Sequence, residues 1–156
     1  MKKKHLLLLS LLTLFMLPFL TSCGEEEFIM TEQGTIKMPV KEGCVISEGH
    51  NKILRLTANY PYINVSSIFS LTSRAPEIAY VAQVRDLVEI PLETTEAFSS
   101  KAIIHNQGGY IVKMKLANPG TSSDSKCVVK LLIKEGPIYE GDTPDYLMIE
   151  YAIFRK

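Results

Sequence analysis

Apolar and polar residues alternate with a period of two along several stretches of this chain after Gly34. Successive side chains of an extended strand point to opposite faces, so this period is typical of strands with one buried and one solvent-facing side. The stretches are residues 35–40, 52–58 and 110–116. In the last stretch two faces separate clearly, with Tyr110, Val112, Met114 and Leu116 on one face and Lys113 and Lys115 on the other.

Other runs rich in Val, Ile, Tyr and Phe are short enough to be strands: residues 63–71, 78–84, 127–133 and 146–154. Segments with Gly and Asn separate the runs and favour tight turns, at residues 42–43, 49–51, 106–109, 118–120 and 141–144. Only residues 93–101 suggest a helix, with Thr94 or Thr95 as its N-cap. About six to nine strands and at most one short helix predict a mainly β domain, an antiparallel β-sandwich or a small barrel-like domain.

The run 127–133 makes a sharper prediction if it pairs with residues 110–116. Val129 and Leu131 then share the buried face of that neighbour, whereas Lys130 lies on the opposite face. We expect Lys130 to face solvent, unless the strand is covered on both sides.

The first 22 residues follow a different pattern. Three lysines at residues 2–4 precede an apolar stretch from Leu6 to Leu20, which is shorter than the roughly 20 apolar residues of a permanent membrane-spanning helix. The stretch ends in Leu20-Thr21-Ser22-Cys23, which resembles the lipobox of bacterial lipoprotein precursors. The resemblance implies that residues 1–22 are a signal peptide, and that Cys23 carries acyl chains such as palmitate that anchor the mature protein in a membrane.

Acidic residues follow directly after this cysteine, at Glu25, Glu26 and Glu27. Adjacent carboxylates repel one another and favour an extended, solvated segment, so we expect a lipidated tether of residues 23–33 and a single domain of residues 34–156. The acidic run also resembles the outward-export signal of surface lipoproteins in some Gram-negative lineages. We therefore expect an outer-membrane lipoprotein at the cell surface, with the periplasmic face as the alternative.

The charge of the mature chain bears on its partners. Removal of residues 1–22 takes away three of the 17 basic residues and none of the 17 acidic ones, which leaves a formal charge of −3. Nucleic-acid binding depends on clustered Lys and Arg that neutralise phosphates. The composition therefore argues against a nucleic-acid partner.

A second resemblance involves five segments, at residues 68–70, 88–91, 108–112, 128–133 and 149–154. Their order is similar to that of short β-rich lipoproteins of gut-dwelling anaerobes, which are grouped as a domain of unknown function. The resemblance implies a β-rich fold and an envelope location, and it supplies no catalytic residues.

Two cysteines remain beyond Cys23, and they have two interpretations. Cys44 and Cys127 could form one disulfide, because the compartment permits oxidation, or could both be small buried core residues. A metal site made from these cysteines with His50 and His105 is the weaker hypothesis, because neither histidine has a partner at zinc-ligand spacing. We expect no metal and no other cofactor.

The remaining motifs give little chemistry. No glycine-flanked serine indicates a catalytic nucleophile, so we expect no catalytic residues. The carboxylates of Glu140, Asp142 and Asp145 lack the calcium-loop consensus, so we interpret their segment as a solvated turn. Tyr60 and Tyr62 flank a proline and form the best candidate for an exposed aromatic contact, with core or strand-edge packing as the alternative.

These observations favour a noncatalytic binding or adhesion-type module that is anchored to a membrane by lipid and binds a protein or glycan partner. A structural subunit of an envelope assembly is one alternative. An extracytoplasmic hydrolase built from scattered residues is the other.

Overall fold

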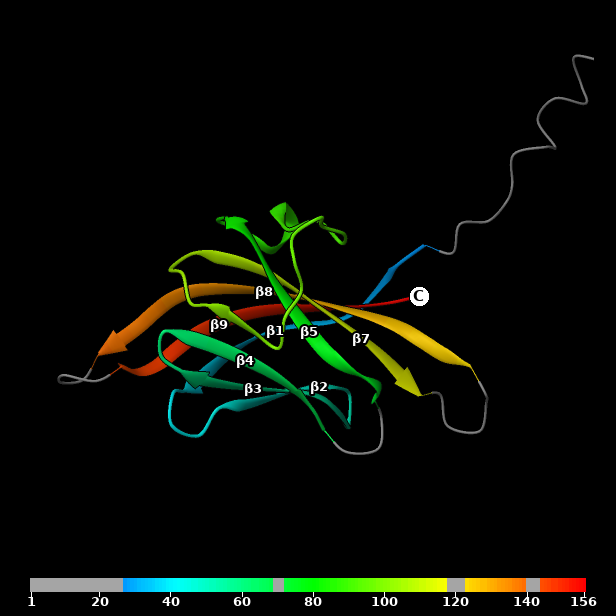
Figure 1. The fold of residues 1–156 in the computed structure, drawn as a ribbon, viewed down its shortest axis with the longest axis horizontal. Coiled ribbons are helices and arrows are strands. Elements are labelled where there is room, and N and C mark those ends of the chain that lie inside the picture. Colours follow the sequence, from blue (N-terminus) through cyan, green and yellow to red (C-terminus); the bar gives the residue numbers. More distant parts are fainter. Residues whose placement is uncertain (1–26, 69–71, 118–122, 140–143) are drawn as a thin grey trace, which may run out of the picture.

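The computed structural model describes residues 27–68, 72–117, 123–139 and 144–156, whose fold is shown in Figure 1. These residues form nine strands and one single-turn 3-10 helix, η2. The elements are β1 Ile29–Pro39, β2 Cys44–Glu48, β3 Asn51–Asn59, β4 Tyr62–Ser67, β5 Thr72–Gln83, η2 Leu87–Glu89, β6 Lys101–Ile103, β7 Gly108–Ala117, β8 Asp124–Tyr139 and β9 Pro144–Arg155. All strand pairs are antiparallel, and the mainly β prediction is confirmed.

The strands form two sheets that face each other (Figure 1). One sheet has five strands in the order β1-β9-β8-β7-β5, and the other has four in the order β2-β3-β4-β6. The expected sandwich is therefore confirmed. The barrel-like alternative is not formed, because the strands divide between two separate sheets.

Tyr110, Val112, Val129 and Leu131 show how the core is built between the sheets. Tyr110 lies opposite Leu131, and Val112 lies opposite Val129, so the four side chains form two cross-strand pairs on one face. All four are fully buried in the main cluster, together with Ile46, Leu54, Leu56 and Ile63 from the facing sheet. The period-two prediction for these two strands is confirmed.

The outer face of the five-stranded sheet carries a second, smaller core. Residues 84–98 cross this face, and Val84 and Ile90 pack there against Ile111, Val128 and Leu132 of β7 and β8. We call residues 84–98 the covering segment. Strand β8 is consequently buried on both faces from Cys127 to Ile133.

Lys130 lies on this covered face, so the prediction that it is solvent-exposed is wrong. Only 8% of the residue is accessible, and its Nζ lies 5.0 Å from the centre of the Phe154 ring. Burial lowers the pKa of Lys130 below its ordinary value. The expectation failed because the cover comes from a segment about 40 residues away in the sequence, which no local pattern reveals.

The turn predicted at residues 106–109 is shorter than expected. Gln107 has a φ of 55°, whereas Gly108 and Gly109 already belong to β7. A Cβ at Gly109 would lie 2.9 Å from a methyl of Val84 and 3.0 Å from a side-chain carbon of Ile90. The absent side chain of Gly109 thus lets the covering segment pack closely on the sheet.

The predicted helix at residues 93–101 is not formed. Thr94 Oγ1 accepts a hydrogen bond from the Glu96 amide at 3.2 Å, as an N-cap would, but no helix follows. Instead Ser99 exchanges two backbone hydrogen bonds with Ile78 of β5, and β6 pairs with β4. Residues 99–103 therefore connect the two sheets along one side, and this tertiary pairing overrides the weak helical propensity. The single helical turn of the described chain is η2, which Asp86 caps.

The domain begins earlier than the expected boundary at Gly34. Strand β1 starts at Ile29 and pairs with β9 from the Ile29–Arg155 pair onward, so residues 29–33, which were expected to be part of a tether, belong to the sheet. These residues were missed because β1 is an edge strand whose first part is largely exposed, and polar residues such as Glu32 and Gln33 are tolerated there.

Candidate functional site

The sandwich has two distinct ends. Strand β1 starts at one end with Ile29, opposite Arg155, and we call this the amino-terminal end. Glu48 binds Arg155 there, and β3 starts beside Glu48 and runs to Asn59. A nine-residue strand is about 27 Å long, so the turn after Asn59 lies at the opposite end, which we call the far end (Figure 1).

The two tyrosines predicted as ligand contacts lie at the far end. Tyr60 is 51% exposed and Tyr62 is half-buried. Tyr62 pairs across the strands with Ile103, which is 49% exposed, and Lys101 Nζ lies 4.4 Å from the centre of the Tyr62 ring. We call Tyr60, Tyr62, Lys101 and Ile103 the far-end patch.

The backbone holds this patch in place. The Ile104 amide donates a hydrogen bond to the Pro61 carbonyl at 2.8 Å, and Tyr110 Oη donates one to the Ile103 carbonyl at the same distance. The Tyr110 hydroxyl also accepts a 2.8 Å bond from the His105 amide, and burial raises its pKa above the ordinary value. The patch is therefore an exposed apolar surface on a rigid support, which suits binding at low entropic cost.

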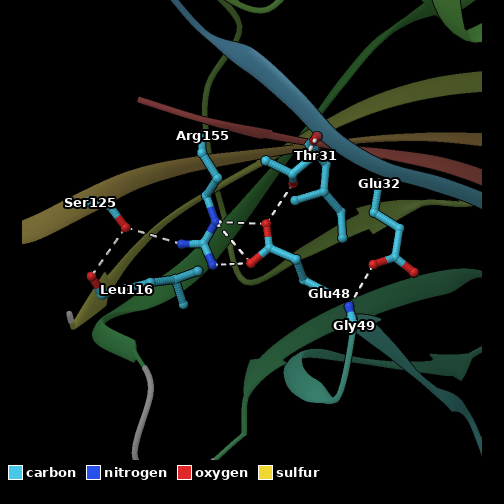
Figure 2. Close-up of polar contacts among 8 residues, drawn as sticks. Thr31, Glu32, Glu48, Gly49, Leu116, Ser125 and Arg155 are labelled. Atoms are coloured by element: carbon cyan, nitrogen blue, oxygen red, sulfur yellow. Dashed lines mark hydrogen bonds and ion pairs between the residues drawn. The ribbon is translucent and has the colours of Figure 1, made fainter. Parts of the chain in front are cut away.

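A polar cluster joins the sheets at the amino-terminal end (Figure 2). The Arg155 guanidinium of β9 forms an ion pair with the Glu48 carboxylate of β2, with Nε 3.1 Å from both carboxylate oxygens. Arg155 Nη1 donates to Ser125 Oγ at 3.0 Å, and Thr31 Oγ1 donates to Glu48 at 2.5 Å. The Arg155 hydrogen bond is the main cause that lowers the pKa of Glu48 below its ordinary value. Every group here has a protein partner, so we interpret the cluster as a fastener between the sheets.

Cys44 and Cys127 are free thiols, so the disulfide, one of their two interpretations, is not formed. Cys127 lies opposite Arg155, and Arg155 binds Glu48, the last residue of β2. Cys44 lies at the other end of β2, as its first residue. Four strand steps correspond to about 13 Å, well beyond the roughly 4.4–6.8 Å between Cα atoms that a disulfide requires. Their alternative interpretation is confirmed for Cys127, which is fully buried in the main core, and Cys44 packs against the same core while partly exposed.

The histidines and acidic residues do not converge. His50 lies in the exposed turn between β2 and β3, whereas the His105 ring stacks 4.4 Å from the Tyr80 ring, centre to centre. Among the described residues no group of three or more His, Cys, Asp and Glu side chains could hold a metal ion. Glu140 and Asp142 lie outside the described residues, and Asp145 accepts the Val40 amide through its backbone carbonyl.

A cavity of about 310 Å³ lies beside the covering segment at the amino-terminal end. We call it the outer cavity. Its walls include the aromatic rings of Phe28 and Phe98, and basic side chains such as Lys113 and Lys156 surround it. No local sequence pattern predicts this site, because its lining comes from β5, β7 and β8, from the covering segment and from both ends of the domain.

The residues that resemble a lipobox and most of the acidic run lie outside the described part of the chain. This applies to Cys23, Glu25 and Glu26, whereas Glu27 is the first residue described and is exposed. None of the helical segments within the described ranges is long and apolar enough to cross a membrane.

Comparisons of this chain with protein-family models, with curated proteins and with solved structures give no match.

Proposed function

We propose that this chain is a lipid-anchored protein of the cell envelope whose β-sandwich serves as a noncatalytic binding module at the cell surface. The observation that carries the proposal is the lipobox-like sequence Leu20-Thr21-Ser22-Cys23, which precedes the first strand by only a few residues. Two or three acyl chains on Cys23 would give an anchor that hardly dissociates, since each buried methylene contributes about 0.8 kcal/mol.

The short tether determines how the module is presented. Six residue steps separate Cys23 from Ile29, and an extended chain covers at most about 3.6 Å per residue, or about 20 Å in total. The amino-terminal end therefore stays near the membrane, and the far end, at the other end of the sandwich, points away from it. This orientation supports partner binding through the far-end patch.

The far-end patch suits a protein or a glycan partner. Tyr60 and Ile103 present exposed apolar surface, and tyrosine combines a flat apolar ring with a hydroxyl that can donate or accept hydrogen bonds. Tyrosine is common among the side chains that dominate binding energy at protein interfaces.

Site-specific photocrosslinking on intact cells tests this assignment. A photoreactive phenylalanine analogue at Tyr60 should capture a partner, whereas the same analogue at Val88 should not. Val88 is a matched control because it is 81% exposed and lies on η2, on the outer face of the other sheet. Digestion of the adduct with protease or glycosidase then identifies the partner class. Equal capture at both positions, or none at Tyr60, would remove the patch from the proposal.

Surface display has its own test. Protease added to whole cells should cut the wild-type domain. Replacement of Glu25, Glu26 and Glu27 by Ala should reduce that cleavage, because the acidic run is the proposed signal for export to the surface. Complete protection of the wild-type domain would place it on the periplasmic face and leave the glutamates as a spacer.

A further inference from the structure

The outer cavity lies in a row of basic residues that the strand register creates. Arg74 of β5 lies opposite Lys115 of β7, and Lys115 lies opposite Lys126 of β8. Lys126 exchanges two backbone hydrogen bonds with Lys156, at 3.0 and 3.1 Å. Four basic residues thus lie side by side, on three strands and at the position directly after β9, and we call Arg74, Lys115, Lys126 and Lys156 the basic row.

This row is unfavourable by itself. Neighbouring strands are about 4.8 Å apart, and like charges directly opposite one another destabilise a sheet. The row also occurs in a mature chain whose formal charge is −3, so overall composition does not explain it. Only Arg74 has an ion-pair partner among the described residues, Glu77 at 3.6 Å.

The cavity next to the row is largely apolar. Phe28, Leu92 and Phe98 contribute to its walls, and Val128 lies on the sheet beneath them. Lys113 Nζ lies 4.6 Å from the centre of the Phe98 ring, and Lys156 Nζ lies 5.6 Å from the centre of the Phe28 ring. Aromatic rings thus accompany both ammonium groups. Glu77 lies opposite Lys113 across the strands, but its printed ion pair is with Arg74.

The lining combines an apolar interior with an excess of positive charge. Five basic residues line the cavity, namely the basic row and Lys113, against two acidic ones, Glu77 and Glu93. A volume of about 310 Å³ is at the lower end of the roughly 300–1,000 Å³ typical of small-molecule sites. The ligand that fits both properties is small, apolar along most of its length, and anionic at one end.

We propose that the outer cavity binds a single-chain amphipathic anion of the fatty-acid class. The acyl chain would lie among Phe28, Leu92 and Phe98, and the carboxylate would neutralise part of the basic row. This inference goes beyond the proposed partner binding at the far end. It does not depend on the lipid anchor.

Binding of a fluorescent fatty acid, 11-(dansylamino)undecanoic acid, tests the proposal. The protein is the whole mature chain of residues 23–156 with Cys23→Ser, which contains every described residue. Saturable binding is expected, and the methyl ester of the probe, which lacks the charge, should bind about tenfold more weakly or worse. Absence of saturable binding, or equal binding of acid and ester, would overturn the proposal.

Charge-neutralising variants locate the site. The triple variant Lys115→Gln, Lys126→Gln and Lys156→Gln should weaken binding about tenfold or more, because it removes three charges of the row. A matched triple, Lys37→Gln, Lys41→Gln and Lys52→Gln, removes three charges from exposed positions elsewhere and should bind like the wild type. The row variant should also melt no lower than the wild type, since it relieves repulsion, so a folding defect does not obscure the result. Equal affinity of the two triples would overturn the assignment to this cavity.

A variant of the acidic run separates an external ligand from the chain's own leader, whose carboxylates directly precede Phe28. Replacement of Glu25, Glu26 and Glu27 by Ala should leave probe affinity within about twofold. Binding that becomes detectable only in this variant would overturn the proposal, because the cavity's natural occupant would then be the leader. Photocrosslinking at Tyr60 reports on the far end separately from all these outcomes.

Discussion

The ion pair between Glu48 and Arg155 connects the two sheets at the amino-terminal end, so its coupling energy measures how firmly they are fastened there (Figure 2). We consider Glu48→Gln, Arg155→Met and the double variant, which together form a double-mutant cycle. Each single change keeps much of the side-chain volume and removes one charge.

The magnitude follows from the partial burial of the pair. The side chains of Arg155 and Glu48 are 24% and 20% exposed. Fully exposed pairs contribute about 0.2–1 kcal/mol, whereas breaking a buried pair costs about 3–5 kcal/mol. We expect a coupling of about 1–2 kcal/mol, and a loss of about 2–3 kcal/mol for Arg155→Met, which leaves the Glu48 carboxylate without its main donor.

The pair Lys134–Glu150 provides a matched control. Its atoms are 3.3 Å apart, but its side chains are 46% and 28% exposed, and it joins two strands of the same sheet. We expect a coupling below about 1 kcal/mol for this pair, since solvent screens it more strongly.

The pH dependence has a definite sign. The folded-state pKa of Glu48 lies below the ordinary 4.5, chiefly because Arg155 donates hydrogen bonds to the carboxylate. The resulting stabilisation is fully present above the unfolded pKa and is lost as the pH falls through the folded pKa. Urea unfolding at pH 7 and at pH 3 should therefore show a coupling at pH 7 that shrinks at pH 3. A coupling below about 0.5 kcal/mol at pH 7, or one independent of pH, would refute the interpretation of the cluster as a fastener.

Further predictions concern the core and the thiols. Leu131→Asp should prevent folding, because it buries an unpaired charge between the sheets, and Lys130→Asp should cost about 2–3 kcal/mol in thermal melts because the covering segment hides this face too. Tolerance of Lys130→Asp, with Lys130→Met as the neutral control, would contradict that cover. Gly109→Val should lower the free energy of unfolding by about 1–3 kcal/mol, because the new side chain collides with Val84 and Ile90. An unchanged melting temperature would contradict this close packing. Burial raises the pKa of Cys44 to about 11 and that of Cys127 to about 12, so both thiols should react slowly with a disulfide reagent at pH 8 and rapidly in urea. A melting temperature that falls on addition of reductant would indicate a disulfide instead.

Local patterns were enough to predict the inner face of the sandwich. Val112, Met114 and Leu116 alternate with Lys113 and Lys115 along β7, and alternation is a property of each strand alone. The exposed position of Tyr60 was also predictable, because Pro61 beside it disfavours regular pairing.

Properties that depend on distant segments could not be predicted. The burial of Lys130 requires the covering segment, and the separation of Cys44 from Cys127 depends on how the two sheets are placed. The basic row, Arg74, Lys115, Lys126 and Lys156, is the clearest case. The register of three strands and the backbone hydrogen bonds of Lys156 with Lys126 bring its members side by side. A one-residue shift of any strand would send its basic side chain to the other face.

The early start of β1 shows a further limit of pattern reading. Residues 29–33 have an exposed, partly polar surface, so they resemble a tether in sequence although they pair with β9. Their pairing leaves only a few residues for the proposed tether, and the orientation proposed for the module depends on that length.

The lipid anchor at Cys23 is the central claim of the account, and mass spectrometry of the amino-terminal peptide of the membrane-derived protein tests it most directly. We predict a mature chain that begins at Cys23 and carries acyl groups on that residue, and we predict that a Cys23→Ala chain is neither acylated nor processed at this position. An unmodified Cys23, or a mature chain that begins elsewhere, would contradict the account.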